Sequence, residues 1–462
     1  MAEIVKRHKP LSVKPLKSSQ PLGASLAFLG INNTIPLLHG SQGCTAFGKI
    51  FLIQHFREPI PLQTTAMDQV TTIMGADDNV IEGLKTLADK AQPDLVGVIT
   101  TGLSETQGSD IKRVVKAFYA AHPECAAMKV VAVNTPDFNG CLESGFALAA
   151  TAMINELVPA EQASTQPRQV NVLVGSFLTP GDIETLKEVI ESFGLRPLVF
   201  PDIADALDGH VTERNFTPTS IGGLSVTEIP QLARSVATLV IGASMFTVAD
   251  TLKDRTGISD YRFETLMGLE AFDQFLLTLQ SISGQPVPAR FERQRSQLQD
   301  AMLDTHFMLG QARFAIAADP DILYALSQFV KSMGGEIVTA VAPIYTELLT
   351  QIPTNEVKIG DLEDFEQRAS AQKAQIVLSN AHAVDSAKRL GIPLLRVGFP
   401  QFDWVGGYQR TWIGYRGSRQ VLFDLANLLL SQHQGIQPYR SQYAQADEPR
   451  TPEYLHTPSS HP

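Results

Sequence analysis

The chain has few cysteines and no long apolar segment. Three cysteines in 462 residues cannot form a disulfide framework, so we expect the thiols to stay reduced. No apolar run approaches the roughly 18 residues that a membrane helix requires. The first ten residues, MAEIVKRHKP, carry positive charge but no apolar stretch follows them, unlike a secretory signal. These absences predict a cytoplasmic protein.

An excess of basic charge is also missing. Lys and Arg number 37 against 48 Asp and Glu, a net charge of −11, and the one basic cluster lies in a Pro-containing lead segment at residues 6–17. Nucleic acid is therefore disfavoured as the main partner, because its phosphates require a basic face. The chain has 44% hydrophobic residues and a mean hydropathy of +0.00, which are typical of a globular protein.

Three stretches, residues 78–99, 170–200 and 314–338, combine helical and strand patterns. In the first, Asp78-Asn79 is a suitable N-cap pair for a helix that precedes a strand at 95–99. The other two have the order strand, turn, helix, strand, with helices predicted over 182–193 and 321–333. This alternation predicts an α/β fold with parallel sheets.

The second and third stretches also match each other in detail. Pro180-Gly181-Asp182-Ile183 before Gly194 corresponds to Pro320-Asp321-Ile322 before Gly334, about 140 residues later. The match indicates a repeated Rossmann-like domain. The alternative is that any such helix begins with Pro and Asp and ends with Gly.

Polar, Pro-containing segments near residues 161–168 and 284–295 indicate linkers between domains. After Leu430 the sequence becomes polar and Pro-rich. We expect about three domains from the length. The predicted divisions are a lead segment at 1–17, a first α/β domain at 18–165 that carries Cys44, Rossmann-like domains at 166–290 and 291–430, and a mobile tail at 431–462.

The segment from Leu37 to Lys49 contains the most informative cysteine, Cys44, between Gly43 and Gly48. We expect this cysteine on a loop, where backbone N–H groups can approach a metal-bound thiolate. A buried, inert thiol is the alternative. Gly43 to Lys49 also fits G-x-x-x-x-G-K, but Ile50 stands where a P-loop needs Ser or Thr, and Pro36 makes residues 33–38 a poor central strand.

Cys125 and Cys141 lie outside any metal-binding spacing. Cys125 is expected in a turn before a strand at 130–133, and Cys141 at the start of a helix. An iron–sulfur cluster commonly takes four thiolates, so a cluster here needs ligands from another chain. His39 and His55 are expected to be structural hydrogen-bonding groups. No G-x-S-x-G, H-E-x-x-H or G-x-G-x-x-G motif supports a hydrolase or dinucleotide site.

Several segments together resemble the nitrogenase component 1 family, over nearly the whole chain to about Leu430. The resemblance implies three Rossmann-like α/β/α domains. The segments are Ser19–Ala24, His39–Cys44, His55–Pro59, Thr100–Glu105, Asn134–Gly140, Asp300–His306 and Gly398–Asp403.

The departures from the family pattern concern three cysteines. In the catalytic β subunit these bind the eight-iron P-cluster, in patterns like C-Q-P-x-G-A, H-G-S-x-G-C and T-T-C-x-x-E. This chain has Ser19, Cys44 and Gly102 at those positions. Glycine has no ligating side chain, and a serine alkoxide is a hard substitute for a soft thiolate. One ligand of three remains.

That pattern resembles the β-like subunit of the scaffold complex on which the iron–molybdenum cofactor matures. The resemblance implies that Cys44, on the Gly43 turn, supplies one thiolate to a [4Fe–4S] cluster shared with a NifE-type partner in an α2β2 heterotetramer. It also implies a cofactor precursor donated by NifB and held mainly by the partner, together with docking of the nitrogenase iron protein.

Two other readings stay open. The first is a catalytic, electron-transferring β subunit of a nitrogenase-like reductase, against which Ser19 and Gly102 argue. The second is a Rossmann-like protein that binds a nucleotide or small metabolite, which would leave Cys44 without a role.

Overall fold

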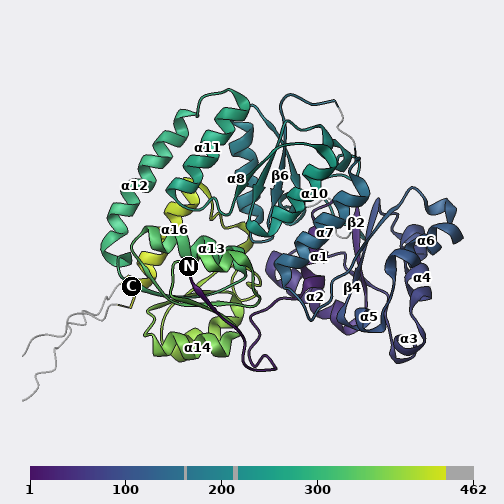
Figure 1. Ribbon diagram of the computed structural model, residues 1–462, viewed down its shortest axis with the longest axis horizontal. Coiled ribbons are helices and arrows are strands. Elements are labelled where there is room, and N and C mark those ends of the chain that lie inside the picture. Colours follow the sequence, from purple (N-terminus) through teal and green to yellow (C-terminus); the bar gives the residue numbers. More distant parts are fainter. Residues whose placement is uncertain (161–163, 212–216, 433–462) are drawn as a thin grey trace, which may run out of the picture.

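The computed structural model describes residues 1–160, 164–211 and 217–432. It contains three β-sheets in which every strand pair is parallel. Each sheet and its helices form one unit, and in Figure 1 the first unit lies at the right, the second at the top and the third at the lower left. The predicted α/β class with parallel sheets is confirmed.

The first sheet has the strand order β3-β2-β4-β5. Helices α1 and α7 pack together and contact β2, β4 and β5, and α4 and α6 pack together away from them (Figure 1). The strands are β2 (Thr34–His39), β3 (Gln63–Thr64), β4 (Leu95–Thr100) and β5 (Lys129–Val133). The helices are α1 (Gln20–Leu29), α2 (Gln42–Phe56), α3 (Gln69–Met74), α4 (Asp77–Lys90), α5 (Gly102–Gln107), α6 (Ile111–Ala121), the 3-10 turn η1 (Pro123–Cys125) and α7 (Leu142–Leu157).

The prediction that residues 33–38 are a poor central strand is wrong. Strand β2 lies between β3 and β4, with Pro36 opposite Gly97 of β4. Strand β3 pairs only with Leu37 and Leu38. The sheet therefore has an open position beside Pro36, where a residue without an N–H group is tolerated.

The second sheet has the order β7-β6-β8-β9. When the strands of each sheet are numbered in chain order, the first and second sheets both have the order 2-1-3-4. Helix α8 begins at Pro180, two residues before the predicted start, because Thr179 caps it reciprocally with Asp182. The elements are β6 (Gln169–Val174), α8 (Pro180–Glu191), β7 (Arg196–Phe200), α9 (Ile203–Ala206), η2 (Ile229–Arg234), β8 (Ala237–Ile241), η3 (Ala243–Met245), α10 (Phe246–Thr256), β9 (Asp260–Phe263) and α11 (Leu269–Ser283).

The third sheet has the order β1-β12-β11-β10-β13-β14. Without β1, this is the 3-2-1-4-5 order of a Rossmann-type sheet. Its elements are α12 (Ala289–Leu309), β10 (Arg313–Ala317), α13 (Pro320–Ser332), β11 (Glu336–Ala342), η4 (Glu347–Gln351), β12 (Glu356–Ile359), α14 (Leu362–Ala371), β13 (Ile376–Ser379), η5 (Ala381–Ala383), α15 (Val384–Leu390), β14 (Leu394–Arg396), η6 (Gly407–Gln409) and α16 (Gly414–Leu430).

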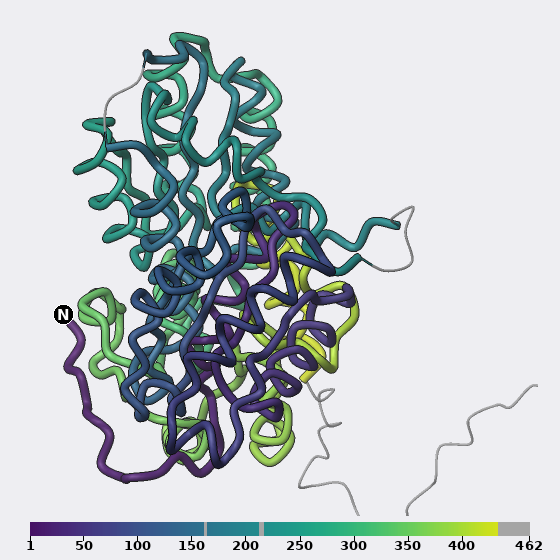
Figure 2. The backbone as a smooth tube through the Cα atoms, turned by 90° about the vertical axis from the view of Figure 1, so that its right-hand side faces the viewer, coloured from purple at the N-terminus to yellow at the C-terminus, as the bar shows by residue number. Residues whose placement is uncertain are grey.

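The edge strand of this sheet, β1 (Glu3–Val5), comes from the other end of the chain and pairs with β12. The following segment runs along the outside of the molecule to the first unit (Figure 2). Lys9 anchors this segment to the third unit: its Nζ lies 2.7 Å from Asp361 Oδ1 and 2.8 Å from Glu363 Oε2. The domain boundaries stay a prediction, and the tail predicted from 431 lies outside the described residues from 433 onward.

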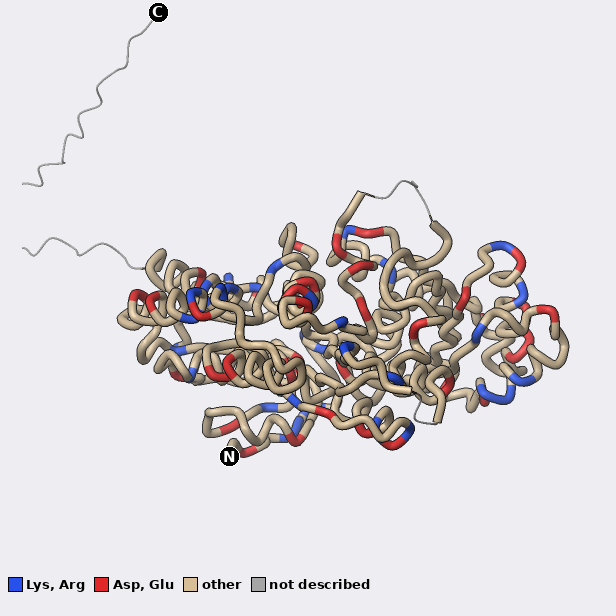
Figure 3. Tube along the Cα trace, turned by 90° about the horizontal axis from the view of Figure 1, so that it is seen from above, with Lys and Arg blue, Asp and Glu red and all other residues tan. Residues whose placement is uncertain are grey.

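One apolar cluster continues through all three units. No helix in the described ranges is long and apolar enough to cross a membrane. Lys and Arg are interspersed with Asp and Glu along the described chain (Figure 3).

Helices α1 and α7 approach each other through two glycines. A Cβ atom at Gly23 would lie 1.8 Å from the carbonyl oxygen of Leu142, and one at Gly145 would lie 2.0 Å from that of Gln20. These contacts are with backbone atoms, so a side chain there has to separate the helices.

We therefore expect Gly23→Ala to destabilise the chain by about 3 kcal/mol. Gly83→Ala is the matched control, because its Cβ atom would lie 3.8 Å from the nearest atom, Leu37 Cδ2, and alanine favours the interior of α4. Urea unfolding followed by circular dichroism measures both. A Gly23→Ala midpoint equal to that of wild type would contradict the packing argument.

Candidate functional site

Cys44 is the third residue of α2, directly after the carboxyl end of β2. The prediction of a loop is wrong at this residue: Ser41 has extended backbone angles (φ −75°, ψ 155°) and serves as the N-cap, so the helix begins at Gln42. The Ser41 hydroxyl lies 3.4 Å from Cys44 Sγ and donates a hydrogen bond to it. The thiol is exposed, which excludes the buried, inert alternative.

The two glycines before Cys44 have different roles. A Cβ atom at Gly40 would lie 2.6 Å from Thr101 Oγ1, so the close approach of these two segments requires glycine. At Gly43 a Cβ atom would meet nothing within 4 Å among the described atoms. The space beside Cys44 is therefore open toward the surface.

The chain places the three family cysteine positions at the starts of three helices. Ser19 is the N-cap of α1, Cys44 lies in the first turn of α2, and Gly102 is the first residue of α5. Thr101 Oγ1 donates to the His39 carbonyl oxygen at 2.9 Å, which holds the beginnings of α2 and α5 together. The described residues contain no group of three His, Cys, Asp or Glu side chains suited to a metal ion.

Large apolar side chains are exposed around Cys44. Phe47 (68% exposed) and Ile50 follow Cys44 on the outer face of α2, opposite the buried Thr45, Leu52 and Phe56. Helix α3 contributes Val70, Ile73 (82%) and Met74, and the loop before α7 contributes Phe138. We call these residues with Cys44 the Cys44 surface: Cys44, Phe47, Ile50, Val70, Ile73, Met74 and Phe138.

The elements of the Cys44 surface are neighbours. The Met67 N–H, just before α3, donates to the Gly40 carbonyl oxygen at 2.9 Å, and the Gln107 side chain of α5 donates to the Thr71 carbonyl oxygen at 2.8 Å. Helices α2, α5 and α3 follow one another along the lower side of the first unit in Figure 1. An exposed apolar area of this kind indicates a protein interface.

Cys125 and Cys141 occupy the positions predicted for them, at the end of η1 and at the N-cap of α7. Both side chains are buried. Burial raises the pKa of the Cys141 thiol, which disfavours the thiolate that a metal requires. Of the three cysteines, only Cys44 is exposed.

The two histidines make hydrogen bonds within the chain, as predicted. His39 Nδ1 lies 2.9 Å from Thr65 Oγ1, and burial lowers the pKa of His39 to about 4. His55 Nδ1 accepts a hydrogen bond from the Gln401 N–H at 3.0 Å, and burial lowers the pKa of His55 to about 3. Both imidazoles are therefore neutral at neutral pH.

Sequence reasoning missed the apolar half of the site. The signal was available in α2, where Phe47 and Ile50 are spaced three residues apart after Cys44 and cannot share a face with Leu52 and Phe56. A helix that is apolar on both faces indicates a second packing partner.

Comparisons with known proteins identify the family. The model of the family described as nitrogenase component 1 type oxidoreductase matches residues 19–430. The chain is 44% identical over 449 residues to the nitrogenase iron-molybdenum cofactor biosynthesis protein NifN of Klebsiella pneumoniae, with 97% of each chain covered. It is 45% identical over 430 residues to NifN of Nostoc sp., covering 93% of this chain and 96% of that one.

Solved structures support the same relationship. A chain of nitrogenase Cp1 at pH 6.5 superposes with a TM-score of 0.87 and 29% identity, over 93% of this chain and 95% of that chain. The resemblance inferred from the motifs is confirmed. The chain therefore belongs to the nitrogenase component 1 family, among the NifN proteins of iron–molybdenum cofactor biosynthesis.

Proposed function

We propose that this chain is a subunit of the scaffold on which the precursor of the nitrogenase iron–molybdenum cofactor matures, and that Cys44 supplies one thiolate to a [4Fe–4S] cluster shared with a NifE-type partner. The observation that carries the proposal is that the single exposed thiol lies within an exposed apolar surface. A cluster of this kind takes four thiolates, so the other three come from the partner.

The residues around Cys44 suit a cluster. The thiol lies at the N-terminus of a 15-residue helix, where unpaired N–H groups and the helix dipole favour negative charge. Gly43 leaves room for sulfide to approach the backbone. When bound, the cluster supplies one-electron redox chemistry or structural linkage between subunits.

The same proposal assigns the remaining partners. The chain and its NifE-type partner form an α2β2 heterotetramer in the cytoplasm, the partner holds most of the precursor donated by NifB, and the nitrogenase iron protein docks on the complex. The chain then contributes a ligand, an interface and part of a docking face, without turnover of its own.

The alternative is a catalytic β subunit that transfers electrons through a P-cluster. Ser19 and Gly102 oppose it, because neither residue offers a thiolate at the start of α1 or α5. Reduction of substrate by the purified complex would favour this alternative.

Cys44→Ala tests the cluster assignment. We expect the variant to assemble with the partner but to lose the shared cluster, or to retain it only as a labile three-iron form. The measurement is anaerobic iron and acid-labile sulfide content, with EPR, on the co-purified complex. Wild type should contain four irons per αβ pair beyond those of the precursor.

Cys125→Ala and Cys141→Ala are the matched controls, since both remove a buried thiol elsewhere in the first unit. Each should keep the full iron content. A full cluster in Cys44→Ala would refute the ligand role, and loss of the cluster in either control would reassign it.

A further inference from the structure

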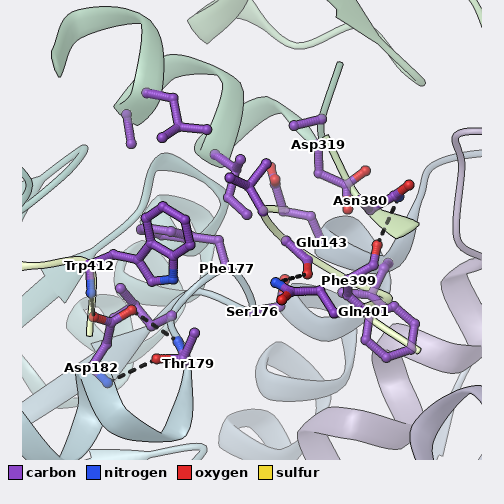
Figure 4. Close-up of a pocket in the computed structure, with 18 of the residues that line it drawn as sticks. Glu143, Ser176, Phe177, Thr179, Asp182, Asp319, Asn380, Phe399, Gln401 and Trp412 are labelled. Carbon is purple, nitrogen blue, oxygen red and sulfur yellow. Dashed lines mark hydrogen bonds between the residues drawn. The ribbon is translucent and has the colours of Figure 1, made fainter. Parts of the chain in front are cut away.

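A cavity of about 70 Å³ lies where the three units meet (Figure 4). A buried water needs roughly 10–15 Å³ by the same kind of measure, so the cavity has room for several waters or one small organic molecule. Its walls come from the end of α2, the start of α7, the segment after β6 and the ends of β10 and β13.

The position is that of a ligand site in α/β proteins. In the third sheet the strand order reverses between β10 and β13, and residues that follow these two strands, Ala318, Asp319 and Asn380, line the cavity. In the second sheet the order reverses between β6 and β8, and Ser176–Pro180 after β6 line it as well. Crevices at the carboxyl ends of such strands are where these folds bind ligands.

Polar atoms without partners face this space. Because His55 Nδ1 accepts from Gln401, the proton of the neutral ring is on Nε2, and this N–H has no hydrogen-bond partner among the described residues. Glu143 Oε2 accepts from the Asp321 N–H at 3.0 Å, whereas Oε1 has no partner in the described part of the chain. His55 is 7% and Glu143 4% exposed, and both line the cavity. A buried polar group of this kind calls for a ligand or water.

The charge of the lining has one sign. Glu143, Asp182 and Asp319 contribute carboxyl groups, and none of the described lining residues is Lys or Arg. Asp182 is fully engaged by backbone N–H groups of Thr179, Trp412 and Ile413. Figure 4 shows Glu143, Asp319 and Asn380 on one side of the cavity, and Trp412 on the other.

Neighbouring carboxyl groups disfavour the ionisation of both Asp319 and Glu143. Burial and the neighbouring Asp321 raise the pKa of Asp319 to about 7, and burial with Asp321 and Asp319 raises the pKa of Glu143 well above its usual range. The Cys141 thiol and Lys17 are the other groups that act on Asp319, and they only partly offset this effect. A cation in the cavity would relieve the repulsion.

We propose that this cavity binds a small organic amine, with its ammonium group on the carboxylates of Asp319 and Glu143, a hydroxyl or carbonyl oxygen on His55 Nε2, and its alkyl part against Phe177, Phe399 and Ile322. A metal ion does not suit the site, because the described residues contain no group of three metal-ligating side chains. An anionic ligand is disfavoured, because it would lie beside the Asp319 carboxylate.

This inference is independent of the cluster assignment. The cavity uses residues of all three units and none of the Cys44 surface. A Cys44→Ala chain should bind the amine as wild type does, so failure of one proposal leaves the other standing. A bound molecule would also contact all three units at once and so limit their relative movement.

The test uses three probes that differ only at one end: 4-amino-1-butanol, 1,4-butanediol and 4-hydroxybutyrate. Isothermal titration calorimetry on the full chain, alone and with its partner, measures their Kd values at pH 7.5. We expect the amine to bind at least tenfold more tightly than the diol, and hydroxybutyrate more weakly than either. Equal binding of all three, or no binding of the amine, would overturn the proposal.

Variants locate the site. Asp319→Asn keeps the size of the side chain, which makes no capping hydrogen bond at the start of α13, and it should remove the preference for the amine while leaving the diol unaffected. Ile322→Trp fills the cavity and should weaken both. Asp385→Asn, on the surface, is the matched control. If Asp319→Asn fails to fold, Glu143→Gln replaces it, and an unchanged amine preference in the folded variant would place the ligand elsewhere.

Discussion

The double variant Phe47→Asp/Ile73→Asp is expected to lose assembly with the NifE-type partner. Both side chains are mostly exposed in the isolated chain, at 68% and 82%, so the chain itself should still fold. In the complex each carboxylate would have to be desolvated in an apolar interface at a cost of at least 2 kcal/mol. The affinity should fall by roughly a thousandfold.

The measurement is co-purification followed by size-exclusion chromatography with light scattering. Val211→Asp is the matched control, because Val211 is 98% exposed and lies outside the Cys44 surface. The double variant should elute as the free chain with a wild-type melting temperature, and the control should assemble. Normal assembly of the double variant would contradict the assignment of this surface as the partner interface.

Together with Cys44→Ala, this variant separates two functions of one surface. Cys44→Ala should lose iron but keep the partner, whereas the double Asp variant should lose both. If Cys44→Ala also prevented assembly, the cluster itself would be the main link between the subunits.

Local patterns predicted much of the fold. The predicted start of α8 is two residues after its observed start, and that of α13 is one residue after. The predictions come this close because Pro in the first turn and a polar N-cap leave a clear signal. Helix α4 begins at Asp77, one residue before the predicted cap pair, and its first-turn acidic residues suit the helix dipole. Cys44 was singled out from its motif, and the structure places its thiol at the surface.

Features that depend on distant pairing could not be predicted. Glu3–Val5 forms a strand only because Glu356–Lys358 lies beside it, about 350 residues later. Pro36 is tolerated in a central strand only because β3 is short. Neither cause leaves a trace in the local sequence.

The cavity could not be predicted from the sequence either, because it depends on contacts between distant segments. Glu143 of the first unit accepts from the backbone of Asp321 in the third, and Asp321 accepts from the Ser244 hydroxyl of the second at 2.6 Å. Each residue alone resembles an ordinary helix-cap residue. These residues meet only because the three units pack against one another, and the local sequence of each unit does not indicate that packing.

A second buried carboxylate, besides Asp321, joins the second unit to the third. Asp182, at the start of α8, accepts hydrogen bonds from the Trp412 N–H at 2.6 Å and the Ile413 N–H at 3.1 Å, and also from the Thr179 N–H at 3.1 Å. It is 1% exposed. Removing the carboxylate leaves one buried and two partly buried N–H donors without a partner.

We expect Asp182→Ala to lower the free energy of unfolding by about 4 kcal/mol at pH 5, because each unsatisfied donor costs roughly 1–3 kcal/mol and water recovers part of it. The melting temperature should fall by about 4 °C, because the unfolding entropy of a chain of this length is about 1 kcal/mol/K. Differential scanning calorimetry of the chain without its partner measures the effect. A decrease below 2 °C would show that the contact between α8 and the segment before α16 is not what holds these units together.

Asp182→Asn separates the hydrogen bonds from the charge, since its carbonyl oxygen can still accept from Trp412 and Ile413. Burial raises the pKa of Asp182 from 3.8 to about 6 in the folded chain. As pH rises from about 4 to 6, the unfolded chain loses this proton first, so wild type loses stability that the Asn variant keeps. Between pH 4 and pH 7 the unfolding free energy of wild type should fall by about 2 kcal/mol relative to that of the Asn variant. A difference that is constant with pH would show that the carboxyl group of Asp182 ionises as easily in the folded chain as in the unfolded one.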